Sequence, residues 1–486
     1  MLFNSYSFIF LFLPITLFVY FQLNRISSFK VAQCWLVVAS LFFYGWWNPI
    51  YLVLIVSSMI FNYLIGRKIS KQITIRKKYI ILFFGVATNL VLLGYFKYAD
   101  FFLVNVNRLF TTDISLLHLA LPLAISFFTF QQIAYLVDSY KEKTKEYDFL
   151  TYVLFVTFFP QLIAGPIVHH KQMLPQFNEK NRFFNNKNFS LGLFVFSIGL
   201  FKKVVIADKL AVPATYGFDV AESLDLVNAW FTSLSYTFQL YFDFSGYTDM
   251  AIGIALLFNI KLPVNFNSPY KALTIQDFWR RWHITLSTFL RDYIYIPFGG
   301  SRKSNFNTYR NLMITFILGG LWHGAGWNFI LWGGLHGFAL VIHRAWQLHS
   351  NIKLNKWLAW FITFNFINIT WVFFRAKDWD SARKVLQGMF DFTNFSVTEK
   401  YQWLADFLSA YDIVINRVNE YIIVEVESNV AVYILLSFIL VLLFRNTSER
   451  IENFSFSWQT SVYSALCFSV ALLFINKNSE FLYFNF

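Results

Sequence analysis

Apolar runs, each close to the length of a membrane-spanning helix, recur along almost the whole chain of 486 residues. A helix needs about 20 mostly apolar residues to cross the hydrocarbon core of a bilayer. Runs that reach or approach this length lie at 8–24, 31–47, 50–65, 79–98, 116–137, 189–207, 228–244, 357–374, 431–444 and 460–476. This succession predicts an all-α integral membrane protein that crosses the bilayer many times.

The composition agrees with a lipid environment. Charged residues make up 14% of the chain, against about 25% in soluble globular proteins. The formal net charge is +13, but bases of membrane proteins gather in cytoplasmic loops beside anionic headgroups, so we expect no nucleic-acid partner. The two cysteines lack metal-ligand spacing, and we predict neither a metal site nor a tightly bound cofactor.

The distribution of bases predicts the orientation. The loop 66–78 carries six Lys or Arg and no acid, and 261–310 is also basic, so both are assigned to the cytoplasm. The acidic stretch 208–226 is then an extracytoplasmic loop, and both termini lie outside. Because bases flank 311–343 on both sides, this Gly-interrupted run must enter the membrane and return, turning near 322–327.

Two histidines lie in that hairpin. His323 is costly at membrane depth unless it faces a protein interior or a water-filled cavity. Its side chain titrates near neutrality, which suits a general base, but a core histidine bonded to a carbonyl is an equal alternative. For His336, between glycines, a role in helix packing is favoured.

Two further stretches mix polar and aromatic residues. The stretch 275–293 is typical of an amphipathic helix at the cytoplasmic interface, with Phe278, Trp282 and Phe289 near one face. A more specific alternative is that its arginines bind the phosphates of coenzyme A. The segment 243–249 is either a polar loop or helix cap, or the lining of a polar path. Asn265–Tyr270 is typical of a turn.

Together these segments resemble the membrane-bound O-acyltransferase family, and most closely its bacterial alginate and peptidoglycan O-acetyltransferases. The resemblance extends essentially end to end. It rests on FDFSGYTDMAIG at 242–253, NFNSPY at 265–270, WRRWHITLSTFLRDY at 279–293 and GGLWHG at 319–324. Supporting matches lie at 1–5, 44–47, 159–166 and 373–376.

The resemblance implies one multi-pass domain over 1–486, built as a ring of roughly 10–13 tilted transmembrane and re-entrant helices around a central funnel or tunnel. It implies that the core lies at about 228–345 and that 375–430 is extracytoplasmic. His323 matches the essential membrane-embedded histidine of the family, and His283 its second, frequently required histidine.

The expected substrates follow from the same resemblance. Acetyl-CoA would enter from the cytoplasm, and a polysaccharide hydroxyl would be acetylated outside. The residues assigned to donor binding are Arg280, Arg281, Arg291 and Trp279, and those assigned to the substrate path are Asp243, Ser245, Tyr247, Asn267 and Trp322. The family often works with an external esterase-like (SGNH-type) or alginate-acetylase-like partner, in the inner membrane of a bacterium.

The tail 477–486 ends in FLYFNF, which resembles the Phe-x-Tyr-x-x-Phe ending of related cell-wall acylation systems. In those systems the tyrosine is thought to relay the acyl group, and Tyr483 matches it. The alternative is an aromatic tail docked at the interface. Three other functions stay open: D-alanyl transfer from a carrier protein onto teichoic acid, transport without chemistry, and a scaffold for a separate acetyltransferase.

Overall fold

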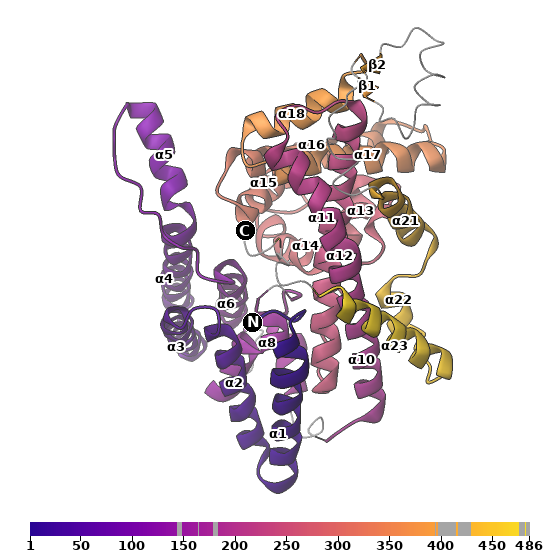
Figure 1. Ribbon diagram of the computed structural model, residues 1–486. Helices are drawn as coiled ribbons and strands as arrows, with labels where there is room; N and C mark the ends of the chain where they lie inside the picture. Colours follow the sequence, from indigo (N-terminus) through magenta and orange to yellow (C-terminus); the bar gives the residue numbers. More distant parts are fainter. Residues whose placement is uncertain are drawn as a thin grey trace.

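The computed structural model describes residues 1–142, 148–163, 165–177, 183–393, 395–396, 415–416, 429–475 and 482. These residues are mostly helical, as the sequence predicts (Figure 1). The strands are one parallel pair of two residues each, β1 (Phe395–Ser396) and β2 (Ile415–Asn416). Tyr483 lies outside the described residues.

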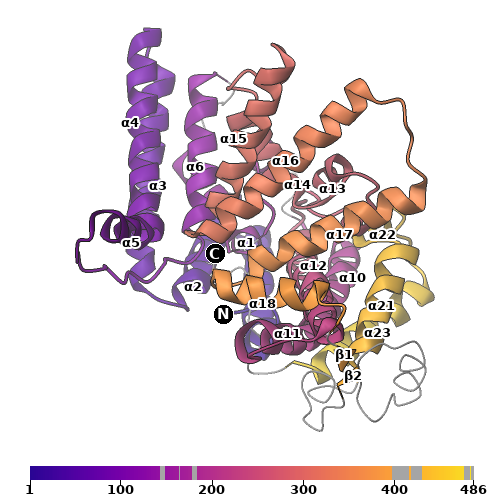
Figure 2. The same cartoon turned by 90° about the horizontal axis from the view of Figure 1, so that it is seen from above.

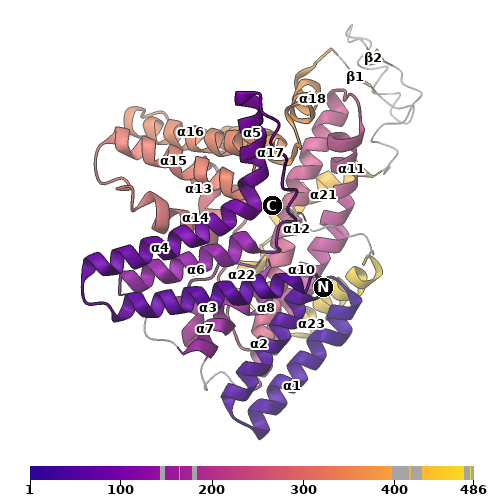
Figure 3. The same cartoon turned by 90° about the vertical axis from the view of Figure 1, so that its left-hand side faces the viewer.

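The N-terminal part packs as a group of long helices. They are η1 (Phe8–Phe12), α1 (Leu13–Ile26), α2 (Phe29–Gly45), α3 (Ile50–Lys71), α4 (Ile75–Leu93), η2 (Gly94–Tyr98), α5 (Ala99–Phe110) and α6 (Ile125–Tyr140). Figure 3 shows α3, α4 and α6 side by side, and each contacts the other two. Short helices follow: α7 (Phe149–Thr157), α8 (Phe159–Leu162), α9 (His170–Met173) and η3 (Leu174–Gln176).

The rest of the chain surrounds one long central helix, α12 (Leu226–Leu257). The other elements are α10 (Asn186–Phe201), η5 (Lys202–Ala207), α11 (Asp208–Thr215), η6 (Tyr216–Val220), η7 (Pro269–Lys271), α13 (Ile275–Arg281), α14 (Ile284–Leu290), η8 (Arg291–Tyr295), α15 (Asn305–His323), α16 (Trp327–His349), α17 (Lys356–Arg375), α18 (Trp379–Phe390), α21 (Val430–Leu443), α22 (Thr447–Glu452) and α23 (Trp458–Leu473). In Figure 1, α12 stands between α3–α5 on one side and α21–α23 on the other.

Five described helical segments are long and apolar enough to cross a membrane. They are Phe8–Ile26, Ile50–Lys71, Ile75–Phe110, Asn186–Val220 and Lys356–Arg375. Helix α12 differs from them, because every residue from 235 to 257 is buried in protein. A helix that is buried all round lies in the interior, and α12 forms that interior here.

Helices α10 and α12 cross at paired glycines. A Cβ on Gly199 would lie 2.6 Å from the carbonyl oxygen of Gly246, and one on Gly253 would lie 2.7 Å from that of Gly192. Small residues at such crossings let helix backbones approach closely, which is how helices gain packing contacts in lipid. The close approach holds the polar centre of α12 against α10.

The hairpin that the sequence predicts is confirmed. Helices α15 and α16 run side by side and are joined by a turn at Gly324–Gly326 (Figure 2). Their backbones are close because Gly333 of α16 lies against Phe316 and Gly320 of α15.

Three local predictions are wrong. The stretch 208–226, predicted as a loop, continues the helical segment of α10 through α11 and η6. Of the two alternatives for 243–249, the polar loop or helix cap is wrong, because the segment lies in the middle of α12. The stretch 275–293 is not one helix: Trp282 is extended, and His283 is left-handed with φ of 43°. The turn predicted at Asn265–Tyr270 is confirmed, with Ser268 left-handed at its centre.

Replacement of Gly253 by Ala tests the glycine crossing. The new methyl group would lie 2.6 Å from the backbone nitrogen of Phe196, and a backbone cannot rotate away as a side chain can. We expect Gly253→Ala to destabilise the purified protein by about 1–3 kcal/mol, measured by thermal unfolding in detergent. Gly334→Ala in α16 is the matched control, because its Cβ meets no atom within 4 Å. Equal melting temperatures for the two variants would show that the close packing of α10 on α12 does not require a glycine at position 253.

Candidate active site

His323 is the last residue of α15 and is 4% exposed. Its ring centre lies 4.9 Å from that of Trp322, 5.2 Å from that of Trp332 and 5.1 Å from that of Phe374. The helix ends there because Gly324 and Gly326 are extended and turn the chain into α16. The imidazole is therefore held at the turn of the hairpin inside an aromatic cage.

His283 reaches the same region from a different segment. Its left-handed backbone separates α13 from α14, and its ring is fully buried against Phe244 of α12. Its Nδ1 lies 3.1 Å from Oδ1 of Asn265, which also accepts hydrogen bonds from the backbone and hydroxyl of Thr285. The rings of both histidines flank Trp322, at 6.3 Å for His283 and 4.9 Å for His323.

A cavity of about 540 Å³ leads to His323. It follows α15 from Leu312 to His323, so it runs along the length of that helix. Its polar and aromatic lining residues include Trp279, Arg280, Arg291, Tyr295, Trp332, His343 and Arg344. The structure therefore brings His323 together with three of the four residues assigned to donor binding.

The fourth, Arg281, does not line this cavity. Its Nε donates to Asp277 at 2.9 Å, one helical turn earlier, so its charge supports the local fold of α13. Arg291, although it lines the cavity, is paired with Asp292 at 2.7 Å and is largely exposed. Arg344 on α16 also lines the cavity; the sequence did not indicate this, because a base just after the run 311–343 bears only on the orientation of the chain.

The substrate-path residues of α12 are not at this cavity. Asp243 is 1% exposed and forms an ion pair with Lys203 at 2.5 Å; it also accepts the backbone N–H of Leu482 at 3.2 Å. Ser245 is buried in the same helix, and Tyr247 stacks on Phe3 with ring centres 4.7 Å apart. These side chains form the polar centre of the bundle.

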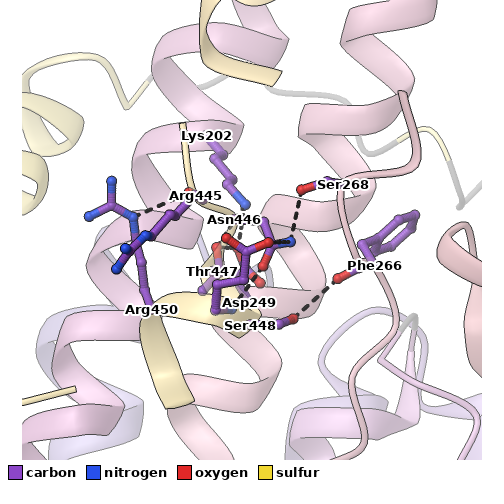
Figure 4. A network of polar contacts seen from close by, with 10 residues as sticks. Lys202, Asp249, Phe266, Ser268, Arg445, Asn446, Thr447, Ser448 and Arg450 are labelled. Carbon is purple, nitrogen blue, oxygen red and sulfur yellow. Dashed lines mark hydrogen bonds and ion pairs between the residues drawn. The ribbon is translucent and has the colours of Figure 1, made fainter. Parts of the chain in front are cut away.

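Asn267 is bound to the C-terminal part of the chain. It accepts a hydrogen bond from Asn446 at 2.7 Å, and the same amide donates to Ser268. Figure 4 shows the neighbouring network, in which Asp249 of α12 accepts from Lys202 at 2.7 Å and from Thr447 at 2.6 Å. The network ties α12 to α22, away from His323, whereas Trp322 is the path residue that contacts it.

His336 has the packing role that the sequence favours. Its Nδ1 accepts the indole N–H of Trp279 at 3.2 Å, and its Nε2 lies 3.1 Å from the hydroxyl of Thr370. Both ring nitrogens are thus occupied, and the ring fastens α13 to α16 and α17.

Lys97 is a residue of the site that sequence reasoning missed. From η2 its Nζ donates to the carbonyl oxygens of Trp322 at 2.6 Å and of His323 at 3.3 Å, and to Ser126 at 3.2 Å. The neighbouring Tyr98 donates to the carbonyl of Leu321 at 2.8 Å. A lone lysine within the apolar run 79–98 was the signal, since such a charge in a membrane span usually has a function.

A second cavity, of about 320 Å³, lies beside the turn that follows His323. Its lining includes Lys97, Asp100, Leu119, Gly324 and Ala325. The chain therefore has one cavity that ends at His323 and another that ends at the residue after it.

The comparisons with known proteins decide the family. The model of the membrane-bound O-acyltransferase (MBOAT) family matches residues 89–377. The chain is 50% identical to the peptidoglycan O-acetyltransferase of Helicobacter pylori, over 100% of this chain and 98% of that protein. It is 42% identical to a probable alginate O-acetylase of Pseudomonas aeruginosa, over 82% of this chain and 76% of that protein.

The chain belongs to the membrane-bound O-acyltransferase family. It is an acyltransferase of the membrane, as the sequence resemblance predicted. Similarity to a teichoic acid D-alanyltransferase of Streptococcus thermophilus is weaker, at 28% identity over 52% of this chain and 68% of that protein. The matched region contains both histidines and Lys97.

Lys97→Met tests whether Lys97 supports the turn at His323 in this acyltransferase. The change removes the charged donor to two carbonyls beside His323, and hydrogen bonds to charged groups contribute about 1.5–3 kcal/mol. A displaced histidine loses rate rather than affinity, so we expect kcat of acyl transfer to fall about 100-fold with little change in KM. Lys77→Met, at an exposed position near the start of the same helical segment, is the control. An unchanged kcat would show that Lys97 does not position His323.

Proposed function

We propose that this protein transfers an acetyl group from cytoplasmic acetyl-CoA to a hydroxyl acceptor outside the membrane, and that the final acceptor is a cell-surface polysaccharide. The observation that carries the proposal is the placement of His323 between two cavities, one bordered by arginines and one beyond the turn. A charged donor then stays on one side while its acyl group reaches the other.

The first cavity suits the donor. Arg280, Arg291 and Arg344 border it, and arginine binds phosphate oxygens through its planar fork. The bases of 261–310 and of the segment after α16 assign this side to the cytoplasm, where acetyl-CoA is made. The thioester would thread along α15, past Trp279, toward His323.

His323 is the general base of this mechanism. One ring nitrogen takes the proton from the acceptor hydroxyl as its oxygen attacks the thioester carbonyl carbon. The tetrahedral intermediate then expels the thiolate of CoA, and the imidazolium returns the proton to that sulfur. Base, nucleophile and leaving group thus meet at one side chain, and no metal is needed for the proton balance.

The negative oxygen of the intermediate needs donors. The indole nitrogen of Trp332 is buried with no hydrogen-bond partner among the described residues, and this ring lines the cavity in contact with His323. A donor held ready in a dry site stabilises charge that develops only during reaction. We assign this role to Trp332. We assign to His283, which lies on the other side of Trp322, the role of orienting the acyl donor.

The second cavity suits the acceptor. The segment 99–115 follows one crossing after the basic loop 66–78, which places it outside. Asp100 in this segment and Leu119 shortly after it line the second cavity together with Gly324. An extracytoplasmic hydroxyl could then approach His323 from the face opposite to the arginines.

Tyr483 is our candidate for that hydroxyl in a two-step transfer. The residue before it, Leu482, donates its backbone N–H to Asp243 at the centre of the bundle, which supports a tail near the core. In the first step Tyr483 would become an acetyl ester, and in the second an external partner would move the acetyl group to the polysaccharide.

Two related acceptors follow from the relatives' names. The Helicobacter relative is named for peptidoglycan and the Pseudomonas relatives for alginate, and the greater identity and coverage of the first favour peptidoglycan. We propose the inner membrane of a bacterium as the location, with both termini outside, and an esterase-like protein as the external partner.

The reaction is tested with His323→Ala in membranes supplied with labelled acetyl-CoA. Loss of the general base should lower transfer of label to extracytoplasmic polysaccharide by about 10²–10⁴-fold. His349→Ala, at an exposed position in α16, is the control for removal of a histidine. Membrane levels and melting temperatures are matched first. Undiminished acetyl transfer by His323→Ala would refute the mechanism. If the native protein transferred an acyl group only from a D-alanyl carrier protein, acetyl-CoA would be the wrong donor.

The relay is tested separately with Tyr483→Phe, which keeps the aromatic ring and removes the hydroxyl. We expect polysaccharide acetylation to fall to background and the acetyl ester on the tail peptide, measured by mass spectrometry, to vanish. Tyr463→Phe, on α23, is the control. Undiminished acetylation of polysaccharide in Tyr483→Phe would mean that the acceptor reacts directly at His323.

A further inference from the structure

A cluster of three metal-ligating side chains lies outside the proposed catalytic site. Asp138 near the end of α6 meets His169 and His170 at the start of α9, and one ligand atom of each lies within 4.8 Å of the others. Asp138 Oδ2 is 2.6 Å from His169 Nε2 and 3.6 Å from His170 Nδ1. None of the three lines the cavity at His323.

Tyr293 completes the cluster from a third segment. Its hydroxyl donates to Asp138 Oδ2 at 2.9 Å and lies 2.8 Å from His169 Nε2. Tyr293 belongs to η8, the segment whose Arg291 and Tyr295 border the cavity. Four oxygen or nitrogen atoms from α6, α9 and η8 therefore converge on one point.

His170 has no structural explanation within this cluster. Its side chain is 1% exposed, and neither ring nitrogen has a hydrogen-bond partner among the described residues. A buried polar group left unpaired costs about 1–3 kcal/mol, so such a group calls for a ligand.

We propose that Asp138, His169 and His170 bind a divalent zinc ion, with Tyr293 or a water in the fourth position. Two imidazoles and a carboxylate favour zinc over magnesium or calcium, which prefer oxygen ligands. Bonds of about 2.0–2.1 Å in a tetrahedron separate ligand atoms by roughly 3.4 Å, close to the 3.6 Å between His170 and Asp138.

The His169 ring must move slightly to admit the ion. Its Nε2 is closer to Asp138 than two ligands of one zinc would be, but the side chain is 31% exposed and free to shift. If His169 binds zinc through Nε2, the ring proton lies on Nδ1. Nδ1 then no longer accepts the long hydrogen bond, of 3.3 Å, from the backbone N–H of Lys171. Lys171 is exposed, so its N–H can bond to water instead.

The proposed role of the ion is structural. It would fasten α6, α9 and η8 where the bases of the chain assign the cytoplasmic face, and thereby fix the rim of the donor cavity. Tyr293 packs on Phe289, which stacks on Phe130 at 4.3 Å between ring centres, and Phe130 stacks on Trp322.

The proposed zinc site does not depend on the acetyl-transfer proposal. It also departs from our prediction of no metal, since these ligands have no metal-binding spacing in the sequence.

The experiment measures zinc on the purified full-length protein in detergent, after removal of any affinity tag. The protein is stripped with EDTA, loaded with ZnCl₂, desalted and analysed by mass spectrometry for metal content. We expect about one zinc per chain and a rise in melting temperature, because an ion that binds only the folded state stabilises it. His170→Ala and Asp138→Asn should lose both effects, and His349→Ala should keep both.

Two results would overturn the proposal. One is a folded native protein that keeps no zinc above the buffer level. The other is a zinc content that is the same in the native protein and in a folded His170→Ala or Asp138→Asn variant. Because the native protein is measured directly, a variant that fails to fold does not leave the question open. Labelled acetyl transfer is not needed for either result, so failure here is distinct from failure of the proposed reaction.

Discussion

The end of α15 is the constraint on which the site depends. A helix that stops inside a membrane protein leaves its last four carbonyls without partners, and no water is present to bind them. Here each has a donor: Gly324 N–H for Gly320, Tyr98 for Leu321, and Lys97 for Trp322 and His323. Because η2 supplies three of these bonds, the N-terminal helices hold the end of α15 and with it His323.

The glycines around His323 have separable tasks. Gly320 and Gly333 let α15 and α16 touch, and a Cβ at Gly324 would collide with the ring of Phe329. The same need for close approach recurs at the crossing of α10 and α12, where it brings charged residues together in the interior. Lys203 bridges Asp208 and Asp243 there, and such a buried cluster is tolerated only because the charges are paired. The close packing of α10 on α12 therefore also brings the paired charges of the interior within contact distance.

Sequence reasoning predicted the elements whose signal is local and apolar. The spans, the hairpin at Trp322–Trp327 and the packing role of His336 follow from length, charge and flanking glycines. It failed where tertiary contacts override the local signal. The loop or cap stayed open as an alternative for 243–249 because the lysines that pair with its acids, Lys202 and Lys203, are distant in sequence. The break at His283 was invisible because Asn265, which holds that ring, lies before the helix begins. Lys97 and Arg344 became site residues only when the fold placed them beside α15.

In the proposed transfer, the two cavities would let a single histidine serve both faces of the membrane without opening a continuous channel. A continuous channel wide enough for CoA would also pass ions, whereas here the turn at Gly324–Gly326 lies between the cavity bordered by arginines and the cavity lined by Lys97 and Asp100. His323 lines the first cavity and the next residue, Gly324, lines the second, so in the proposed reaction the acetyl group would pass between them at this turn. Lys97 donates to the carbonyls of Trp322 and His323 at this turn, so in the proposed mechanism it would both position His323 and keep the turn closed. A cation is suited to both tasks, because its bonds to carbonyls are strong and its charge repels other cations from the turn.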